Sequence, residues 1–461
     1  MPSPEDAVTA FRTVTPNINR QLSLRRFRSI RLQSPHITLT AGSFTNRDDA
    51  AEGCGVTGVH GFLGVRQRQL HRLLGWVLAV IVTLTTGSAI VFSPTADGMV
   101  PARSDLPGVP MVSAKVVTQP SDGATNVSPI GPVRVSVTSG VFEAASLTSS
   151  DGKEIAGQFS PDNTSWTATE PLEYATTYTW SGTATGIDHL PRAIRGSFQT
   201  VKPERLVSAR FNVADNGTYG IAMPIALAFS SRVIDKAAVE RALSVHLSEP
   251  TEGSWAWLSD TTVHWRPKNY FAPDTRVTVT AKLYGVAMGG GAFGRQDIVT
   301  AFTIGRSYVL RGDTRTHRLV AYANGRRVAD YPASYGLDSD PGRASHSGTH
   351  VVMEKYPVFY MSNPKYHYQN VEARSAVRIS SNGEFIHAAP WSVAQQGRTN
   401  VSHGCVNLSP ANAAAVFDAV LTGDPVEITG STRPLTSRDG DYYDWTIPWE
   451  AWTAKSALLG N

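Results

Sequence analysis

Residues 386–408 read I-H-A-A-P-W-S-V-A-Q-Q-G-R-T-N-V-S-H-G-C-V-N-L and hold one of only two cysteines in a chain of 461 residues. This cysteine, Cys405, follows His403 and Gly404, and a second histidine, His387, stands upstream. A thiol attacks as its thiolate, and a free pKa of roughly 8.5 leaves only a small fraction ionised at neutral pH. A histidine within hydrogen-bond reach removes that limit, so Cys with His is the smallest set that can carry acyl transfer through a thioester.

Other interpretations of these residues stay open from spacing alone. A free cysteine is most often an inert buried thiol. His387, His403 and Cys405 are all zinc-ligand types, but H-x-C is not a common zinc spacing and no fourth ligand is obvious, so no metal is predicted. His403 could replace His387 as the base, because residues two apart in an extended segment project to the same side.

A negative charge would develop on the carbonyl oxygen that such a thiol attacks. Backbone N–H groups that point the same way stabilise this charge, and glycine lets the chain turn so that they do. The N–H groups of His403, Gly404 and Cys405 are therefore the candidates for an oxyanion hole.

The stretch belongs to a β-rich unit predicted over residues 305–430, with one clear helix. Asn324-Gly325 and Asn382-Gly383 each predict a two-residue type I′ turn between alternating strands. After the cysteine, Ser409 is a suitable N-cap, Pro410 fits the first helical position, and Gly423 can close the helix.

Upstream, residues 112–203 and 204–304 each contain short segments of alternating β-branched and aromatic residues between turn signals. This spacing predicts two tandem immunoglobulin-like β-sandwiches of about 100 residues each. Trp166 and Trp265 each precede a proline and an aromatic turn, a faint repeat that supports a tandem pair. Gly-Gly-Gly at 289–291 predicts a hairpin tip. Neither stretch offers converging His, Asp, Glu or Cys, so both are predicted to be spacers or docking modules.

Residues 73–92, L-L-G-W-V-L-A-V-I-V-T-L-T-T-G-S-A-I-V-F, carry no charge over the roughly 20 residues that a membrane-spanning helix needs. Arg66, Arg68 and Arg72 precede them, and the positive-inside rule keeps that flank cytoplasmic. We therefore expect a single-pass anchor and a linker at 93–111, with the rest of the chain outside. A cleaved signal peptide is the alternative, because small residues follow the apolar run.

Residues 1–72 show no fold and include the basic run R-R-F-R-S-I-R at 25–31. Such a run could meet nucleic acid or anionic lipid, but we predict a disordered cytoplasmic tail and no nucleic-acid partner. A true start near Val65 would leave an ordinary N-terminal anchor. With a single crossing at residues 73–92, Cys54 is expected to be cytoplasmic and Cys405 outside, so they could not pair. An unpaired thiol in an oxidising compartment is unusual, so Cys405 is a buried bystander, the site of an intermolecular bridge or a reactive group.

The composition, with 41% apolar and 17% charged residues and a net charge of +4, is typical of a soluble protein. Against this background residues 387–409 resemble the signature of the YkuD-type L,D-transpeptidase catalytic domain, a His followed at a distance by S-H-G-C-x-N. The anchor and two sandwiches resemble the actinobacterial, mycobacterial-type members. So does D-W-T-I-P-W-E-A-W (444–452), within a tail at 431–461 that in those enzymes packs on the catalytic domain. The resemblance covers residues 73–461.

The resemblance implies a reaction. Cys405 would attack the carbonyl between diaminopimelate and D-Ala of a donor peptidoglycan stem tetrapeptide and expel D-Ala. The side-chain amine of diaminopimelate on an acceptor stem would take the acyl group, which gives a 3→3 crosslink. His387 would be the general base, and Ala388, where relatives often have Ser, would act through its backbone carbonyl. His403 and Gly404 would supply oxyanion-hole backbone. Carbapenems would acylate the same thiol, and no cofactor is implied.

The resemblance also implies a lid over the substrate channel at residues 356–370. The stretch G-R-A-S-H-S-G-T at 342–349 departs from the family's T-P-x-G pattern. His346, His350 and His367 are scattered and are predicted to be surface or structural residues. Substrate contacts are implied for Tyr368, Asn382, Gly383, Trp391, Ser402, Asn407, Tyr360 and Met353.

The sequence thus predicts a membrane-anchored L,D-transpeptidase whose catalytic domain lies in the cell-wall space. An L,D-carboxypeptidase or a protein-to-wall attachment enzyme, in which water or another amine accepts the same acyl group, is the alternative among enzymes. A non-catalytic wall-binding protein is the alternative of a different class.

Overall fold

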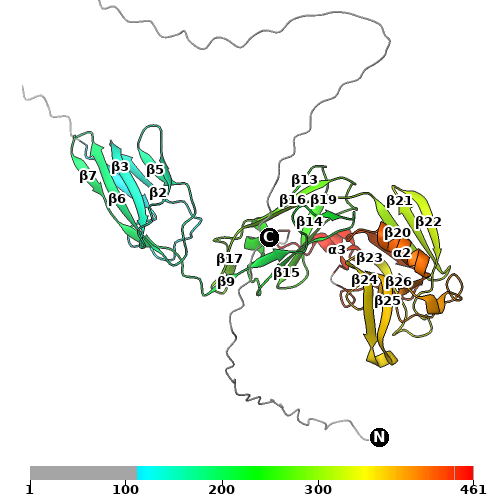
Figure 1. Cartoon of the computed structure of the whole chain (residues 1–461). Helices are drawn as coiled ribbons and strands as arrows, with labels where there is room; N and C mark the ends of the chain where they lie inside the picture. Colours follow the sequence, from blue (N-terminus) through cyan, green and yellow to red (C-terminus); the bar gives the residue numbers. More distant parts are fainter. Residues whose placement is uncertain (1–111, 441, 460–461) are drawn as a thin grey trace, which may run out of the picture. The chain divides into compact units, whose positions relative to one another are not determined.

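The computed structural model describes residues 112–440 and 442–459. These residues are mainly β, as predicted, and their few α-helices are short. No helix among them is long and apolar enough to span a membrane. The predicted anchor at 73–92, the linker and the N-terminal tail lie outside the described residues. Figure 1 shows the strands in three successive groups, called here the first, second and third β units.

Two sheets, β1-β2-β5-β4 and β3-β6-β7 with β8 on β6, form the first β unit. Alternation explains the packing: in β2, Val135 and Val137 are buried between more exposed neighbours. Trp166 and Trp180 meet edge to face in the shared core, with ring centroids 5.4 Å apart. The strands are β1 (Lys115–Gln119), β2 (Arg134–Thr138), β3 (Gly140–Ser149), β4 (Gly157–Phe159), β5 (Ser165–Ala168), β6 (Thr177–Gly186), β7 (Pro191–Ile194) and β8 (Ser197–Gln199).

The second β unit pairs sheet β10-β12-β15-β14 with sheet β11-β19-β16-β13 and adds a small sheet β17-β18-β9. Its predicted hairpin tip is confirmed, because Gly290 and Gly291 turn the chain at φ +54° and +66°. The elements are β9 (Arg205–Val207), β10 (Ala209–Phe211), β11 (Thr218–Tyr219), β12 (Ile225–Phe229), α1 (Lys236–Arg241), β13 (Leu243–Leu247), β14 (Gly253–Trp257), β15 (Thr262–Pro267), β16 (Arg276–Ala281), β17 (Ala287–Gly289), β18 (Ala292–Gly294) and β19 (Ile298–Ile304).

The third β unit holds a sheet in the order β22-β21-β20-β28-β23-β29 and a second sheet β24-β25-β26-β27. Buried side chains of both sheets and of helix α2 form one apolar core. The elements are β20 (Tyr308–Asp313), β21 (Arg318–Ala323), β22 (Arg326–Pro332), β23 (His346–Val351), β24 (Glu354–Asn363), η1 (Pro364–Tyr366), β25 (Tyr368–Arg378), β26 (Phe385–Ala388), η2 (Pro390–Ser392), β27 (Val406–Leu408), α2 (Pro410–Ala419) and β28 (Pro425–Thr429).

Of the two predicted type I′ turns, one is confirmed. Asn324 and Gly325 have φ +48° and +75° between the paired residues Ala323 and Arg326. The prediction for Asn382-Gly383 is wrong, because the flanking strands separate over a longer loop, residues 379–384. Asn382 instead donates its backbone N–H to the carbonyl of Asp439, 3.0 Å away, so the C-terminal segment shapes this loop.

Helix α2 begins as predicted and ends earlier. The Ser409 side chain accepts the backbone N–H of Asn412, and Pro410 opens the helix. The helix ends at Ala419 because Val420 is already extended, at φ −82° and ψ 147°. Gly423 therefore lies beyond the helix, in a tight turn at φ +94° where a Cβ would come 2.7 Å from the Cβ of Met223.

The C-terminal segment contacts two units, whereas the sequence predicts packing on the catalytic domain. Its first part does so, since β29 pairs with β23 of the third unit. Its aromatic part differs: Trp445 donates to the carbonyl of Ala222 at 2.8 Å and Trp452 to that of Ser254 at 3.0 Å, both in the second unit. The elements of this segment are β29 (Arg433–Pro434), η3 (Asp444–Thr446) and α3 (Trp449–Thr453).

The predicted domain limits fall between strands: β8 ends at Gln199 and β9 starts at Arg205, while β19 ends at Ile304 and β20 starts at Tyr308. The limits themselves stay predictions.

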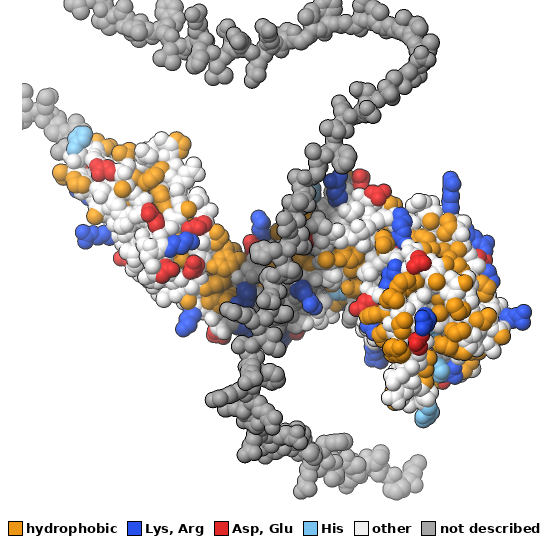
Figure 2. Space-filling view, viewed as in Figure 1, with side chains coloured by type: hydrophobic (Ala, Val, Ile, Leu, Met, Phe, Trp, Pro, Cys, Tyr) orange, Lys and Arg blue, Asp and Glu red, His pale blue; other side chains and the backbone are white. Residues whose placement is uncertain are grey.

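Figure 2 shows one face of the described residues, on which Lys and Arg side chains lie scattered among Asp and Glu.

Candidate active site

Two neighbouring strands bring Cys405 and His387 together. Strands β26 and β27 run parallel, with His387 opposite Asn407. Cys405 stands one residue before β27, and side chains two apart along a strand share a face. Cys405 and Asn407 therefore face the same side as His387, and all three line one cavity. Strand pairing thus brings His387 and Cys405 near each other although they are far apart in the sequence.

Strand β26 is buried on both faces, which fixes the direction of its side chains. Ile386 and Ala388 point into the core that contains Val416 of helix α2. Phe385 and His387 point to the opposite face, where Phe385 packs in a small cluster with Cys405. An apolar strand with a single histidine thus holds that imidazole rigidly beside the thiol.

The imidazole of His387 is oriented by its own neighbour. Its Nδ1 lies 2.9 Å from the carbonyl oxygen of Ala388. A carbonyl can only accept, so Nδ1 carries the proton and Nε2 keeps a free lone pair. Burial lowers the pKa of His387, partly offset by the Ala388 carbonyl and by Asn407. The residue is therefore neutral at pH 7 and able to accept a proton.

Cys405 is 9% exposed, and its Sγ lies 3.6 Å from the carbonyl oxygen of Gly383. Burial raises the pKa of the thiol to about 12; the backbone N–H of Phe385 lowers it and the Glu384 charge raises it further. The resting sulfur is thus a protonated thiol. Its proton must leave during attack, which requires an adjacent base.

The loop before Cys405 is held by hydroxyl groups. Gly404 has φ +116°, a conformation that L side chains rarely adopt. Ser402 Oγ accepts the N–H of Gly404 at 3.2 Å and donates to the carbonyl of Cys405 at 2.6 Å. Ser345 Oγ donates to the carbonyl of Gly404 at 2.6 Å. The seryl hydroxyls therefore lock this turn from both sides.

These hydrogen bonds reduce the number of backbone N–H groups that can form the predicted oxyanion hole. The N–H of Gly404 is already bonded to Ser402 and cannot serve. Within residues 112–440 and 442–459, the N–H groups of His403 and Cys405 donate to no acceptor. These two groups remain the candidates of the predicted three.

The thiol opens into a cavity of about 400 Å³. Four predicted substrate residues line it: Tyr368, Trp391, Ser402 and Asn407. Trp391 is 57% exposed, and its ring centroid lies 6.1 Å from that of His387. The other lining residues are Met361, Val371, His387, Val401, His403 and Cys405.

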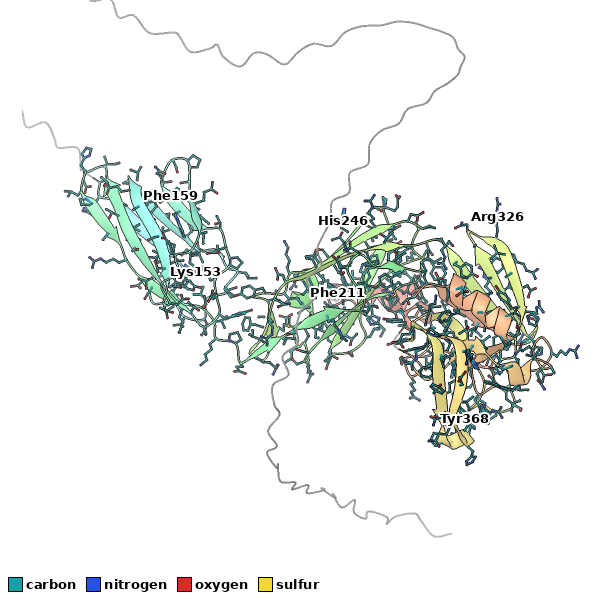
Figure 3. The ribbon with its side chains drawn as sticks, viewed as in Figure 1. Lys153, Phe159, Phe211, His246, Arg326 and Tyr368 are labelled. Atoms are coloured by element: carbon teal, nitrogen blue, oxygen red, sulfur yellow. The ribbon has the colours of Figure 1, made fainter. Side chains whose placement is uncertain are left out.

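Residues 356–370, predicted to form a lid, lie in the hairpin of β24 and β25, which η1 joins, and Figure 3 labels Tyr368 near the tip of this hairpin. The ring of His403 lies against two lid rings, with centroids 4.8 Å from Tyr366 and 5.3 Å from Tyr368. Burial and the charge of Arg343 lower the pKa of His403. The His403 side chain therefore contacts the lid, while that of His387 is fixed beside the thiol.

Four predicted substrate residues do not line this cavity: Tyr360, Met353, Asn382 and Gly383. Tyr360 is 60% exposed, Met353 lies before β24, and the side chain of Asn382 bonds to Asp439 at 3.3 Å. Met361 lines the cavity in place of Tyr360, because neighbours along a strand face opposite sides. Gly383 reaches Cys405 through its carbonyl.

Sequence reasoning missed the apolar lining residues Met361, Val371 and Val401 and the lid residue Tyr366. Strand alternation from Tyr368 would not have found Val371, because residues three apart along a strand face opposite sides. No group of three His, Cys, Asp or Glu residues in the described part of the chain is arranged to hold a metal ion.

Comparison with known proteins decides the family. The L,D-transpeptidase catalytic domain matches residues 307–428, and a bacterial Ig domain matches residues 124–287. L,D-transpeptidase 5 of Mycobacterium tuberculosis (strain ATCC 25618 / H37Rv) is 46% identical over 353 residues, which cover 76% of this chain and 78% of that protein. The chain belongs to the L,D-transpeptidase family.

A second relative agrees with this L,D-transpeptidase assignment. L,D-transpeptidase 2 of Mycobacterium tuberculosis (strain CDC 1551 / Oshkosh) is 34% identical over 396 residues, 83% of this chain and 95% of that protein. A solved L,D-transpeptidase in complex with imipenem has 33% identity and a TM-score of 0.42, and covers 49% of this chain and 100% of that one.

Proposed function

We propose that this L,D-transpeptidase works through a cysteinyl thioester on Cys405 and joins peptidoglycan stem peptides by 3→3 crosslinks. The observation that carries the proposal is the oriented pair at the cavity floor. A neutral imidazole, held by the Ala388 carbonyl with its Nε2 lone pair free, lies on the same face as a protonated thiol. Neither group needs to change charge before substrate binds.

The first half-reaction forms the acyl-enzyme. Cys405 Sγ attacks the carbonyl carbon between diaminopimelate and D-Ala of the donor tetrapeptide, while His387 Nε2 takes the thiol proton. The oxygen of the tetrahedral intermediate is stabilised by the N–H groups of His403 and Cys405. When the C–N bond breaks, His387 returns the proton to the amine of D-Ala, which leaves.

The second half-reaction transfers the acyl group. The side-chain amine of diaminopimelate on an acceptor stem attacks the thioester carbonyl and gives its proton to His387. The C–S bond then breaks, and the sulfur recovers the proton. Water in place of this amine would give a tripeptide, the L,D-carboxypeptidase outcome.

The cavity lining supports a peptide substrate with an aliphatic body. Met361, Val371 and Val401 offer apolar contact, while Tyr368, Asn407 and Trp391 bring polar or aromatic groups to the same space. Such a mixture of apolar walls and a few polar groups is typical of a pocket that orients a small flexible ligand.

We further propose that the enzyme is anchored by residues 73–92 and acts in the cell-wall space. The support is the uncharged run with its preceding arginines, together with an unpaired thiol that an extracytoplasmic enzyme would keep for chemistry. Acylation of Cys405 by carbapenems follows from the resemblance of its motif to the family signature.

The test is incubation of the full chain with a stem tetrapeptide, followed by mass spectrometry. We expect an adduct on Cys405, release of D-Ala and a crosslinked dimer. Cys405→Ala should abolish all three, whereas the matched variant Cys54→Ala should retain them. Equal turnover by Cys405→Ala would overturn the thiol mechanism, and tripeptide without dimer would replace transpeptidation by hydrolysis.

A further inference from the structure

Glu384 is placed to influence the sulfur through both of its neighbours in the chain. Gly383, just before it, has the carbonyl that lies 3.6 Å from Cys405 Sγ. The backbone N–H of Phe385, just after it, lowers the pKa of the same thiol. Whatever fixes the backbone at Glu384 thus fixes the two backbone groups that act on the nucleophile.

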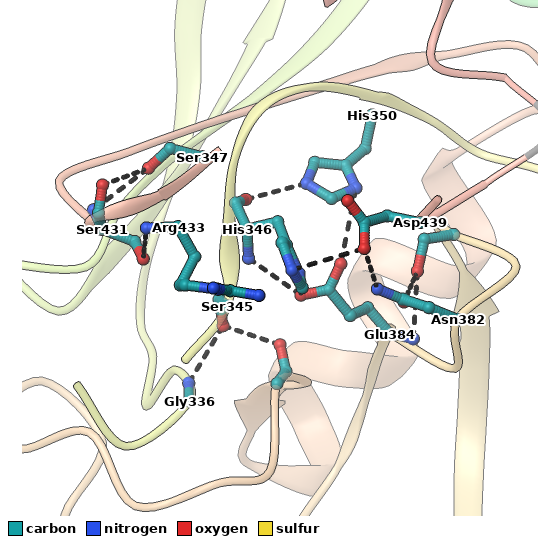
Figure 4. A network of polar contacts seen from close by, with 12 residues as sticks. Gly336, Ser345, His346, Ser347, His350, Asn382, Glu384, Ser431, Arg433 and Asp439 are labelled. Atoms are coloured by element: carbon teal, nitrogen blue, oxygen red, sulfur yellow. Dashed lines mark hydrogen bonds and ion pairs between the residues drawn. The ribbon is translucent and has the colours of Figure 1, made fainter. Parts of the chain in front are cut away.

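Glu384 is a buried carboxyl group, 4% exposed. Its Oε1 accepts the backbone N–H of His346 at 2.9 Å and lies 3.1 Å from His346 Nδ1 (Figure 4). Its Oε2 has no hydrogen-bond partner in the described part of the chain and lies 3.9 Å from His350 Nδ1. Burying an ionised carboxylate costs free energy unless it is paired, and the contact with His346 offsets this cost for Glu384.

His346 is shared between two acids. Its Nε2 lies 3.4 Å from Oδ1 of Asp439, on the opposite side from Glu384. Asp439 comes from the C-terminal segment and also holds Asn382, at the start of the turn that leads to Gly383. Of the other groups facing His346, Arg433 disfavours its charged form, and the backbone carbonyl of His346 lies 2.9 Å from Nε2 of His350.

The network also reaches the turn before the nucleophile. A Cβ on Gly404 would lie 3.5 Å from Cγ of Glu384, so the carboxyl side chain packs directly against that turn. Ser345, the residue before His346, donates to the carbonyl of Gly404 at 2.6 Å. The segments at 345–346 and 382–384 therefore both contact the turn that precedes Cys405, and Figure 4 shows Ser345, His346, Asn382 and Glu384 within one polar network.

The charge of Glu384 affects the thiol of Cys405. A carboxylate near a thiol disfavours the thiolate, and Glu384 raises the pKa of Cys405 in this way. The hydrogen bond to Glu384 raises the pKa of His346, which favours the imidazolium at neutral pH. An imidazolium between Glu384 and Asp439 offsets part of the effect of the Glu384 carboxylate on the sulfur.

Building on the proposed role of Cys405 as nucleophile, we propose that Glu384 is a positioning residue for the thiol and that the imidazole of His346, held between Glu384 and Asp439, offsets the charge of Glu384. The carboxylate fixes the backbone of Gly383 and Phe385, the residues on either side of it in the chain. The imidazolium keeps that carboxylate from opposing the negative charge that develops on sulfur during attack.

The test is the rate of Cys405 alkylation by iodoacetamide in the full chain, in a Cys54→Ala background. His346→Gln leaves Glu384 uncompensated and should slow alkylation roughly tenfold at pH 7, equivalent to about one pKa unit of the thiol. Adding Glu384→Gln to His346→Gln removes the charge and should restore the rate. The difference between the parent and His346→Gln should shrink as pH rises, because the parent's imidazole then becomes neutral as well.

His246→Gln, an exposed histidine of the second unit labelled in Figure 3, is the matched control and should leave the rate unchanged. A double variant that stays as slow as His346→Gln would show that the network acts by packing alone, and an unchanged rate in His346→Gln would also overturn the proposal. Alkylation needs no peptide substrate, so a failure of the proposed function would appear only in the tetrapeptide assay.

Discussion

At the scale of single residues, the site is a neutral pair rather than an ion pair. Burial raises the pKa of Cys405 to about 12 and lowers that of His387. At pH 7 the thiol is therefore protonated and the imidazole is neutral. In the proposed mechanism the thiol proton passes to His387 as the sulfur attacks, so the protonation state of His387 controls the rate.

This predicts the pH dependence of donor acylation. Because the pKa of His387 lies below the ordinary value of about 6.5, the base is ready at and above that pH, and the rate should be flat from about pH 6.5 to 8. It should fall as pH drops through the lowered pKa, since imidazolium cannot accept a proton. The measurement is the rate of adduct formation by mass spectrometry between pH 5 and 9. A tenfold rise in the rate per pH unit between about pH 6.5 and 8 would contradict the scheme and indicate that free thiolate is the nucleophile.

At the scale of elements, the lid is tied to the active-site loop by rings. The tip of the β24–β25 hairpin places Tyr366 and Tyr368 against His403, two residues before the nucleophile. The hydroxyl of Tyr366 is buried without a hydrogen-bond partner among the described residues. Its ring therefore stabilises the contact between this hairpin and His403, while its unpaired hydroxyl opposes that contact.

Two substitutions at Tyr366 should separate these effects. Tyr366→Phe removes an unpaired buried hydroxyl and should leave the free energy of unfolding unchanged or raise it by up to about 1 kcal/mol. Tyr366→Ala removes the ring and should lower it by about 1–3 kcal/mol and slow donor acylation. Denaturant unfolding and the tetrapeptide assay measure both. A Phe variant as impaired as the Ala variant would mean that the hydroxyl binds substrate.

At the scale of the whole molecule, the C-terminal segment joins the third unit to the second. Arg266 of β15 lies under three tryptophans of this segment, with its Cζ 4.7 Å from the ring centroid of Trp445, 5.3 Å from Trp449 and 4.6 Å from Trp452. Burial lowers the pKa of Arg266 to about 10, and Asp444 counters this shift. Asp444 also lies 2.8 Å from Nδ1 of His264.

Trp452 should be the main stabilising residue of this contact, because it is fully buried at 0% exposure. Trp452→Ala should lower the free energy of unfolding by about 3–5 kcal/mol, the usual cost of emptying a buried aromatic site. Trp391→Ala, a tryptophan that is 57% exposed, is the control and should cost far less. Denaturant titration followed by circular dichroism measures both, and equal losses would show that the segment is not a stability element.

The parts of the fold that depend on local chemistry were predictable. Ser409 and Pro410 start helix α2, and Asn324-Gly325 makes its turn, because capping and positive φ are properties of the residues themselves. The loop at Asn382-Gly383 was not predictable, because a contact with the distant Asp439 shapes it. The end of α2 was not predictable either, because the chain is already extended at Val420. The same holds for Tyr360, whose neighbour Met361 lines the cavity since strand phase is set by pairing.

By itself, the sequence determined the β-rich class, the family and the Cys405 and His387 pair, because a reactive thiol needs a base and their motif is specific. Only the tertiary structure decided which N–H groups are free, where the aromatic part of the C-terminal segment packs, and that Glu384 and His346 meet beside the turn that precedes Cys405. The physical reason is that burial, strand register and charge compensation arise between segments far apart in the chain. No spacing within one segment encodes them.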